Sequence, residues 1–254
     1  MKYKNAIVRE PGPEIVNALR TDLLEEPDYS KAVIQHMVYV ETLQTCGLEV
    51  TVLESDHEYP DGCFVEDTAV LTERCAIIDN PGAPSRKGEI TAIGESLSDF
   101  YTDIEHIQDP GTLEGGDVLR VNDHFYIGLS RRTNEKGARQ LSRLLEKYDY
   151  SSSVVELKDM LHLKTGVAYL EKNVLLVAGE FIHNPDFDAF QKIEIEKSEE
   201  YAANCIWVND HVLVPYGFFR TEDAIQKAGF STIPLDVSEF QKLDGGLSCL
   251  SLRF

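Results

Sequence analysis

The chain lacks the features of a membrane-spanning or secreted protein. No stretch of its 254 residues approaches the roughly 20 consecutive apolar residues of a membrane span. The first residues, Met1-Lys2-Tyr3-Lys4-Asn5, lack the apolar run of a secretory signal. We therefore expect a cytoplasmic protein with no membrane partner.

Paired cysteines and basic residues are also scarce. The five cysteines are odd in number and include no Cys-x-x-Cys pair, so the sequence indicates neither a disulfide framework nor a zinc knuckle. The 24 Lys and Arg residues are outnumbered by 44 Asp and Glu residues, giving a net charge of −20. This charge argues against nucleic acid as a partner, because nucleic acid binds basic surfaces. It permits a small cationic substrate.

The rest of the composition is that of a folded protein. Hydrophobic residues make up 43% of the chain, which is enough for a substantial core. No linker-like composition divides the sequence, so we expect one domain over residues 1–254.

Apolar residues at helical spacing predict several helices. The first covers residues 29–46 and ends before Gly47, a residue suited to a helix C-terminus. Its apolar positions are Val33, Met37, Val40 and Leu43. Three further helices are expected over residues 88–101, 133–148 and 221–228.

Short apolar strands come in pairs, and the pairs recur. Five such units begin near Phe64, Leu113, Gly166, Cys205 and Gly245. The repeating unit is a hairpin, a helix and a further strand, at a spacing of roughly 40 to 50 residues, which predicts a closed ring of α/β modules. The charge-rich stretch Glu194–Glu200 is predicted to be a solvated edge or loop.

The recurring turns carry the residues suited to catalysis. In a ring of modules the ends of equivalent strands converge, so these residues can share a pocket: Glu66, Asp67, Glu114, Asp117, His162 and Cys249. A thiol is a nucleophile, carboxylates bind a planar guanidinium through paired hydrogen bonds, and an imidazole can protonate a leaving amine. No His-Glu-x-x-His motif is present, and we expect no metal site.

Five stretches carry a resemblance to a known family: Phe64-Val65-Glu66-Asp67, residues 111–117, residues 161–166, Ala203-Asn204-Cys205 and residues 244–249. Together they resemble the motifs of the bacterial dimethylarginine dimethylaminohydrolases, and the resemblance covers nearly the whole chain. It implies membership of the guanidino-group-modifying superfamily, whose fold is a five-bladed α/β-propeller of ββαβ units, the pentein fold.

The resemblance also implies roles for individual residues. Cys249 would be the nucleophile, His162 the general acid and base, and Glu114 the partner of His162. The residues that would bind substrate are Asp67 and Glu66 at the guanidinium, Arg86 and Arg132 at the α-carboxylate, Asp61 at the α-amino group, Leu19 in a mobile covering loop, and Phe64 and Ser248.

The expected activity is hydrolysis of Nω-methylated arginine to citrulline and a methylated amine, without a cofactor. Arginine deiminase is an alternative, although such enzymes usually carry a helical insertion for which no inter-strand segment is long enough. An amidinotransferase and a non-catalytic binding module of the same fold are further alternatives. A homodimer is compatible with the sequence.

Overall fold

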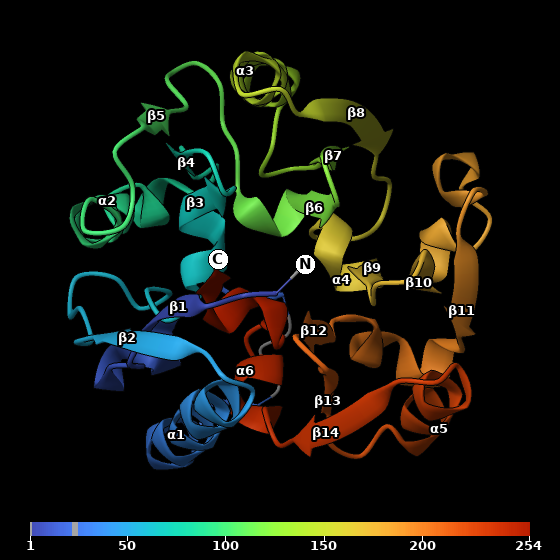
Figure 1. Cartoon of the computed structure of the whole chain (residues 1–254). Helices are drawn as coiled ribbons and strands as arrows, with labels where there is room; N and C mark the ends of the chain where they lie inside the picture. Colours follow the sequence, from blue (N-terminus) through green and yellow to red (C-terminus); the bar gives the residue numbers. More distant parts are fainter. Residues whose placement is uncertain (1, 22–24) are drawn as a thin grey trace. The chain divides into compact units, whose positions relative to one another are not determined.

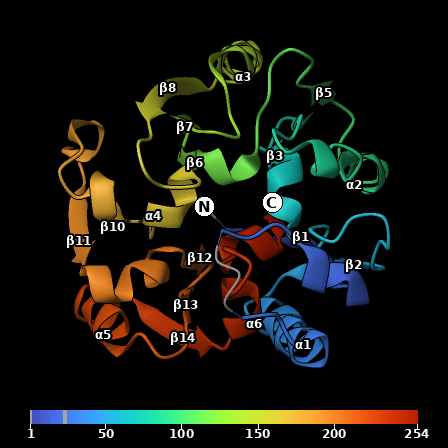
Figure 2. The ribbon, with the colours of Figure 1, turned by 180° about the vertical axis from the view of Figure 1, so that it is seen from behind.

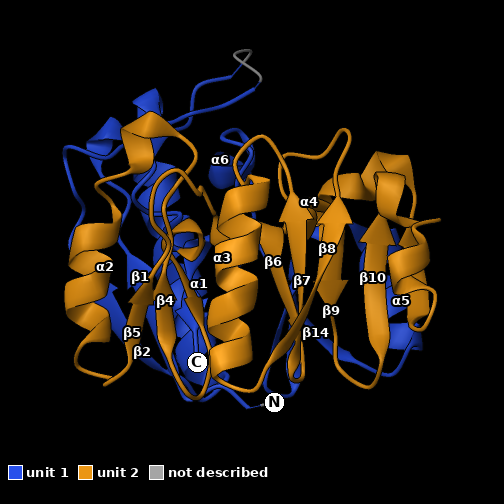
Figure 3. Cartoon of the chain, turned by 90° about the horizontal axis from the view of Figure 1, so that it is seen from above, with its two compact units in different colours: residues 1–65, 204–254 blue, residues 66–203 orange. Residues whose placement is uncertain are grey.

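The computed structural model describes residues 2–21 and 25–254 of the chain, which form two compact units (Figure 3). Unit 1 contains residues 1–65 and 204–254, and unit 2 contains residues 66–203. The single domain expected over residues 1–254 stays a prediction. Residues 22–24, neighbours of Leu19 in the predicted covering loop, lie outside the described residues.

Unit 2 contains three sheets of three strands each, and each sheet joins an antiparallel hairpin to a parallel third strand (Figure 1). The first comprises β3 (Ala69–Leu71), β4 (Ala76–Ile78), α2 (Ile90–Leu97) and β5 (Ile104–His106). The second comprises β6 (Val118–Val121), β7 (His124–Leu129), α3 (Glu135–Lys147) and β8 (Ser151–Glu156). The third comprises β9 (Val167–Tyr169), β10 (Val174–Ala178) and β11 (Gln191–Ile195).

Unit 1 contains two more sheets of three strands. One comprises β12 (Ile206–Val208), β13 (His211–Pro215), α5 (Phe219–Lys227) and β14 (Ser231–Leu235). The other comprises β1 (Asn5–Arg9), α1 (Tyr29–Thr45), β2 (Glu49–Leu53) and β15 (Leu252–Arg253). In it β1 pairs with β2 in parallel and with β15 in antiparallel orientation, so the first and last strands share one sheet. A further short helix, α6 (Ser238–Gln241), precedes the glycine-rich turn that contains Gly245 and Gly246.

Local sequence explains the hairpins and the helix that covers one of them. The turn between β6 and β7 places Asn122 at φ 55°, and the turn between β12 and β13 places Asn209 at φ 54°. Asn tolerates this left-handed conformation, which tight hairpins require. Helix α3 begins after Asn134, whose side chain accepts from the Gly137 N–H, and packs over β7 and β8 (Figure 2). Its Ala138, Leu141 and Leu145, which share one face of the helix predicted over residues 133–148, enter the core.

The buried face of α1 differs from the prediction. Its length agrees, but Val33 is 39% and Met37 52% exposed. Leu43 is buried as expected, but the other residues of the face directed into unit 1 are Ala32, Gln35, His36 and Tyr39. Hydrogen bonds explain how polar groups occupy it: the Tyr39 hydroxyl donates to Leu247 O and contacts Ser251 Oγ at 2.6 Å. Apolar spacing alone identified the helix but not the face that packs.

Two charged stretches of the chain have local structure that the sequence did not specify. The stretch Glu194–Glu200, predicted as a solvated edge or loop, contributes to β11, which is the edge strand of its sheet, and to a 3₁₀ segment, Lys197–Ala203. The run from Phe64 to Leu71, where a strand pair was predicted to begin, is a 3₁₀ turn (Val65–Thr68) followed by β3. The two adjacent carboxylates therefore lie on the turn. Within residues 2–21 and 25–254, no helix is both long and apolar enough to cross a membrane.

Candidate active site

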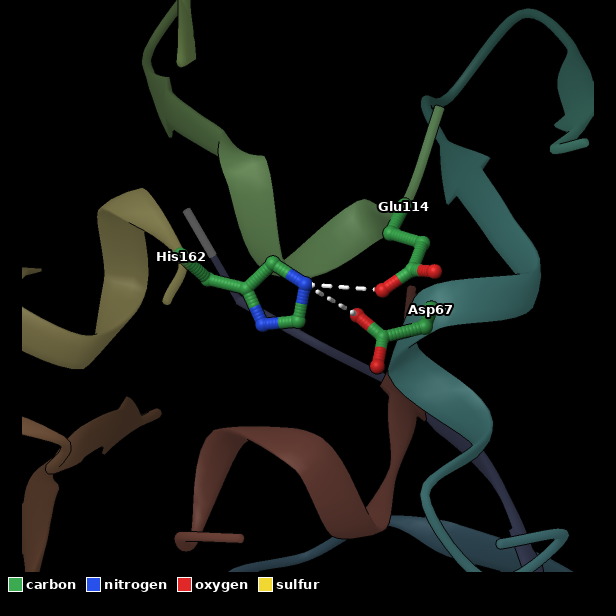
Figure 4. A group of neighbouring side chains, drawn as sticks. All are labelled: Asp67, Glu114 and His162. Atoms are coloured by element: carbon green, nitrogen blue, oxygen red, sulfur yellow. Dashed lines mark hydrogen bonds and ion pairs between the residues drawn. The ribbon is translucent and has the colours of Figure 1, made fainter. Parts of the chain in front are cut away.

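Three buried side chains of unit 2 converge on one point (Figure 4). Asp67 comes from the 3₁₀ turn before β3, Glu114 from the residue preceding the turn Gly115–Asp117, and His162 from the residue preceding α4 (Leu163–Gly166). His162 Nε2 lies 2.8 Å from Glu114 Oε2 and 4.0 Å from Asp67 Oδ1. The structure thus brings together three of the residues predicted from sequence.

Two glycines allow this approach. A Cβ atom on Gly115 would overlap the backbone oxygen of Glu66, and one on Gly116 would lie 2.8 Å from Asp67 Oδ1 and 2.9 Å from the His162 ring. The Gly116 N–H also donates to Asp67 Oδ1 at 2.9 Å. The Gly-Gly pair after Glu114 is therefore needed for packing between turns, not only for a bend.

Backbone donors fix the Glu114 carboxylate. Its Oε1 accepts from the N–H groups of Gly82 and Ala83 at 3.0 and 3.2 Å, while Oε2 meets His162. The Nη1 atom of Arg132 lies 3.4 Å from Oε1. Because Glu114 is fully buried, these donors replace the water that would otherwise solvate its charge. Glu114 is held in the orientation that binds Nε2 of the imidazole.

The surrounding charges make His162 an imidazolium at neutral pH. Burial lowers its pKa. The ionised Asp67 and Asp117 and the hydrogen bond to Glu114 raise the pKa by more than burial lowers it, so that it reaches about 9. Burial raises the pKa of Asp67, but His162 and Arg86 bring it down to about 2. At neutral pH His162 is therefore protonated on both ring nitrogens, and Asp67 is negatively charged.

Two further acids lie near this cluster. Asp117 accepts from the Leu163 N–H at 3.0 Å and from Ser130 Oγ at 2.6 Å, which ties the turn after His162 to β6 and β7, and burial raises its pKa to about 6. Asp79 follows β4 and is 1% exposed. Among the described residues, neither of its carboxylate oxygens has a hydrogen-bond partner, and burial raises its pKa well above 3.8. Unlike the other acids of this cluster, Asp79 has no hydrogen bond from a described residue to its carboxylate that would offset the loss of water on burial.

Both carboxylates of the Glu66-Asp67 pair are matched by cations of unit 2. Lys164 Nζ lies 2.7 Å from Glu66 Oε1. Arg86 Nη1 donates to Asp67 Oδ2 at 2.6 Å, and Arg86 also contacts Glu89. The predicted site residue Arg86 is thus 4% exposed and lies at Asp67.

The same cluster has the donor set of a cation site. Asp67, Glu114 and His162 each offer one possible ligand atom, and these three atoms lie within 4.8 Å of one another. A metal would have to displace the proton that joins His162 Nε2 to Glu114 Oε2, because a ligating imidazole nitrogen must be unprotonated. The expectation of no metal stays a prediction.

In unit 1, Cys249 lies within a single 3₁₀ turn, Ser248–Leu250. It is partly exposed, whereas the other four cysteines are buried. Its Sγ lies 3.5 Å from the Gly246 N and 4.0 Å from Asn204 Nδ2, both of which direct N–H groups at it. These donors would stabilise negative charge on sulfur. Of the strand expected in the unit that begins near Gly245, only β15 forms, after this turn.

Close packing again explains the glycines. A Cβ on Gly245 would overlap the Phe64 ring, and one on Gly246 would overlap the Asn204 side chain. Asn204 Oδ1 also accepts from the Ser248 N–H at 2.9 Å, so Asn204 fixes the turn that carries the thiol. Phe64 and Ser248, both predicted, therefore border the glycine-rich turn.

Asp61, predicted for the α-amino group, and Leu19, predicted in the covering loop, also lie together in unit 1. The Leu19 N–H donates to Asp61 Oδ1 at 3.0 Å. Asp61 is buried, and Leu19 is 40% exposed. Leu19, Asp61, Phe64, Ser248 and Cys249 thus belong to unit 1, and the other predicted site residues belong to unit 2.

Sequence reasoning assigned no role to four residues of these clusters: Asn204, Lys164, Glu89 and Asp79. Asn204 and Lys164 stood inside the recognised motifs, and Glu89 follows Arg86 by three residues, the spacing of neighbours on a helical turn. Asp79 carried no signal, because an acid at a strand end is ordinarily solvated.

Comparison with known proteins identifies the family. A family model described as N,N dimethylarginine dimethylhydrolase, eukaryotic, matches residues 14–202. The N(G),N(G)-dimethylarginine dimethylaminohydrolase of Pseudomonas aeruginosa is 51% identical over 253 residues, which cover 99% of this chain and 100% of that protein. This chain belongs to the dimethylarginine dimethylaminohydrolase family.

Solved structures of dimethylarginine dimethylaminohydrolases agree with the fold. The C249S mutant of the Pseudomonas aeruginosa enzyme, complexed with citrulline, superposes with a TM-score of 0.99 at 50% identity and full coverage of both chains. The H162G adduct with S-methyl-L-thiocitrulline gives 0.98 at 51% identity and covers 99% of this chain and 100% of that one. These matches and the five three-stranded sheets confirm the predicted α/β pentein fold.

Proposed function

We propose that this chain hydrolyses asymmetric dimethylarginine and monomethylarginine to L-citrulline and dimethylamine or methylamine. The observation that carries the proposal is the buried His162 imidazolium, hydrogen-bonded to Glu114 beside the negative Asp67. This arrangement suits a reaction in which a guanidinium carbon is attacked and an amine must leave with a proton.

The first half of the reaction forms a covalent intermediate. Cys249, having released its thiol proton to solvent, attacks the central guanidinium carbon as the thiolate, and the bond from that carbon to the methylated nitrogen then breaks. The electron pair goes to the leaving nitrogen, which takes a proton from His162. Since Glu114 Oε2 holds Nε2, the proton for transfer is the one on Nδ1.

The second half releases citrulline. His162, now neutral, takes a proton from water through Nδ1, and the hydroxide adds to the carbon bonded to sulfur. The C–S bond breaks and its electrons return to Cys249, while the hydroxyl oxygen forms the carbonyl of citrulline and its proton is released to solvent. A pKa of about 9 suits the first transfer, because the imidazole begins the cycle protonated at neutral pH.

Substrate recognition would divide between the two ends of the amino acid. Asp67 and Glu66 would bind the guanidinium nitrogens. Arg132, with Arg86, would bind the α-carboxylate, since guanidinium groups match carboxylates. The remaining predicted residues would bind the α-amino group and border the site: Asp61, Leu19, Phe64 and Ser248.

The relatives support this assignment. In the Pseudomonas aeruginosa enzyme the C249S mutant is complexed with citrulline, and a dimethylarginine dimethylaminohydrolase with H162G forms an adduct with S-methyl-L-thiocitrulline. Both positions hold Cys and His in this chain.

The test is citrulline release from asymmetric dimethylarginine, monomethylarginine and arginine, measured side by side with Cys249→Ser as the control. We expect turnover of the methylated substrates and none in Cys249→Ser. Faster turnover of arginine would favour a deiminase, and no turnover of any substrate by the folded protein would favour a binding module.

We also propose a homodimer formed through α1, and a cytoplasmic location. Four apolar side chains on α1 are 39 to 57% exposed: Val33, Ile34, Met37 and Val38. Burying such a patch favours association. Light scattering should give twice the mass of one chain for the wild type and the mass of one chain for Ile34→Glu. A monomeric wild type would contradict the dimer.

The cytoplasmic location would be tested by fluorescence microscopy of the tagged protein in cells.

A further inference from the structure

Arg86 is bound on two sides by buried carboxylates. Its Nη1 donates to Asp67 Oδ2 at 2.6 Å, and its Nε and Nη2 donate to Glu89 at 3.1 and 2.8 Å. The side chains of Arg86, Asp67 and Glu89 are 5%, 4% and 2% exposed. A buried charge is costly unless paired, so removing one member leaves the others uncompensated.

The position of Glu89 shows that its carboxylate is directed to Arg86. Glu89 is the N-cap residue of α2, yet its side chain makes no capping hydrogen bond. Its carboxylate receives both the Nε and Nη2 donors of Arg86, the two-pronged geometry that fixes the plane of a guanidinium. The N-cap residue of α2 thus holds the Arg86 guanidinium in place.

The anchored guanidinium in turn orients Asp67. Asp67 Oδ2 accepts from Arg86 and Oδ1 accepts from the Gly116 N–H at 2.9 Å, so the carboxylate plane is held from both sides. A carboxylate has about four lone-pair sites, and these two bonds leave capacity for the N–H groups of a further guanidinium.

We propose that Glu89 is a positioning residue, which anchors Arg86 so that Arg86 holds the Asp67 carboxylate in the orientation that binds the substrate guanidinium. The inference rests on the proposed function for the identity of that substrate. It gives Arg86 a role at the guanidinium end, whatever contact it makes with the α-carboxylate.

The test uses two small alkylating agents that lack an α-carboxylate. The Cys249 thiolate displaces chloride from 2-chloroacetamidine, a planar cation, and from 2-chloroacetamide, its neutral counterpart, forming a C–S bond each time. The ratio of the two second-order rates, measured by intact mass with Cys249→Ser as the blank, reports recognition of the cation alone.

The variants are Glu89→Gln, which removes the charge at nearly constant shape, and Arg86→Lys, which keeps a charge without the fork. Glu135→Gln is the matched control, because Glu135 pairs with Arg139 at 3.7 Å on the exposed face of α3. We expect the amidine-to-amide ratio to fall about tenfold or more in Glu89→Gln and Arg86→Lys, and to stay within about twofold in Glu135→Gln.

An unchanged ratio in both variants overturns the proposal. So does a raised KM for dimethylarginine at an unchanged ratio, which would mean that Arg86 serves the α-carboxylate alone. Equal slowing of both reagents overturns it as well, because it reports damage to the thiol turn. If the wild type releases no citrulline but the ratio still falls in Glu89→Gln, the proposed function fails and the positioning role stands.

Discussion

Replacing His162 by Gln should remove a pH dependence of stability that the buried cluster creates. The pKa of His162 is about 9 in the folded chain, against an ordinary value of 6.5. Between these values the folded protein keeps a proton that the unfolded chain has released. The wild type should therefore lose about 1.4 kcal/mol of unfolding free energy per pH unit, or about 3 kcal/mol across the window.

The sign follows from the direction of the shift. A raised pKa stabilises the fold fully below the unfolded value and loses that contribution as the pH rises through the folded value. The raised pKa of Asp117 also makes the unfolding free energy fall as the pH rises. That fall ends near pH 6, the folded-state pKa of Asp117, before the fall caused by His162 begins. Asp79 also acts in this direction, and its contribution cancels when wild type and His162→Gln are compared.

Urea unfolding at pH 6, 7, 8 and 9 measures this difference. The wild-type advantage over His162→Gln should shrink by about 3 kcal/mol from the lowest to the highest pH. A difference that stays constant would refute the reasoning, because it would mean that His162 titrates near its ordinary pKa and that Asp67 and Glu114 do not hold its proton.

Three further substitutions test other parts of the structure. Gly116→Ala should cost about 1–3 kcal/mol in thermal unfolding and lower kcat, because its Cβ would lie 2.9 Å from the His162 ring; an unaltered kcat would contradict that packing. Asn204→Ala should slow alkylation of Cys249 by neutral 2-chloroacetamide, since the turn loses its anchor, and an unchanged rate would exclude this role. Asp79→Asn should be more stable than wild type by an amount that grows as the pH rises above about 4, measured by urea unfolding, and a pH-independent difference would contradict the raised pKa.

Much of the fold follows from local sequence. Repeated hairpin, helix and strand patterns predicted the five units, and the periodic Ala138, Leu141 and Leu145 predicted α3, for which the structure adds the capping residue Asn134. The third sheet departs from the pattern: two 3₁₀ turns, Gly179–Phe181 and Pro185–Phe187, replace the helix before β11. Short turns carry no periodicity, so sequence reasoning had no signal for them.

The sequence by itself determined the family and the chemical types at the site, because motifs such as Leu113-Glu114-Gly115-Gly116-Asp117 keep residues in a fixed local order. Only the tertiary structure decided which charges meet. Asp67, Glu114 and His162 are 47 or more positions apart in pairs, and their protonation depends on distance and burial. The pairing of Arg86 with Asp67 and Glu89 is likewise a result of packing, since a buried cation must lie beside the anions that replace its water.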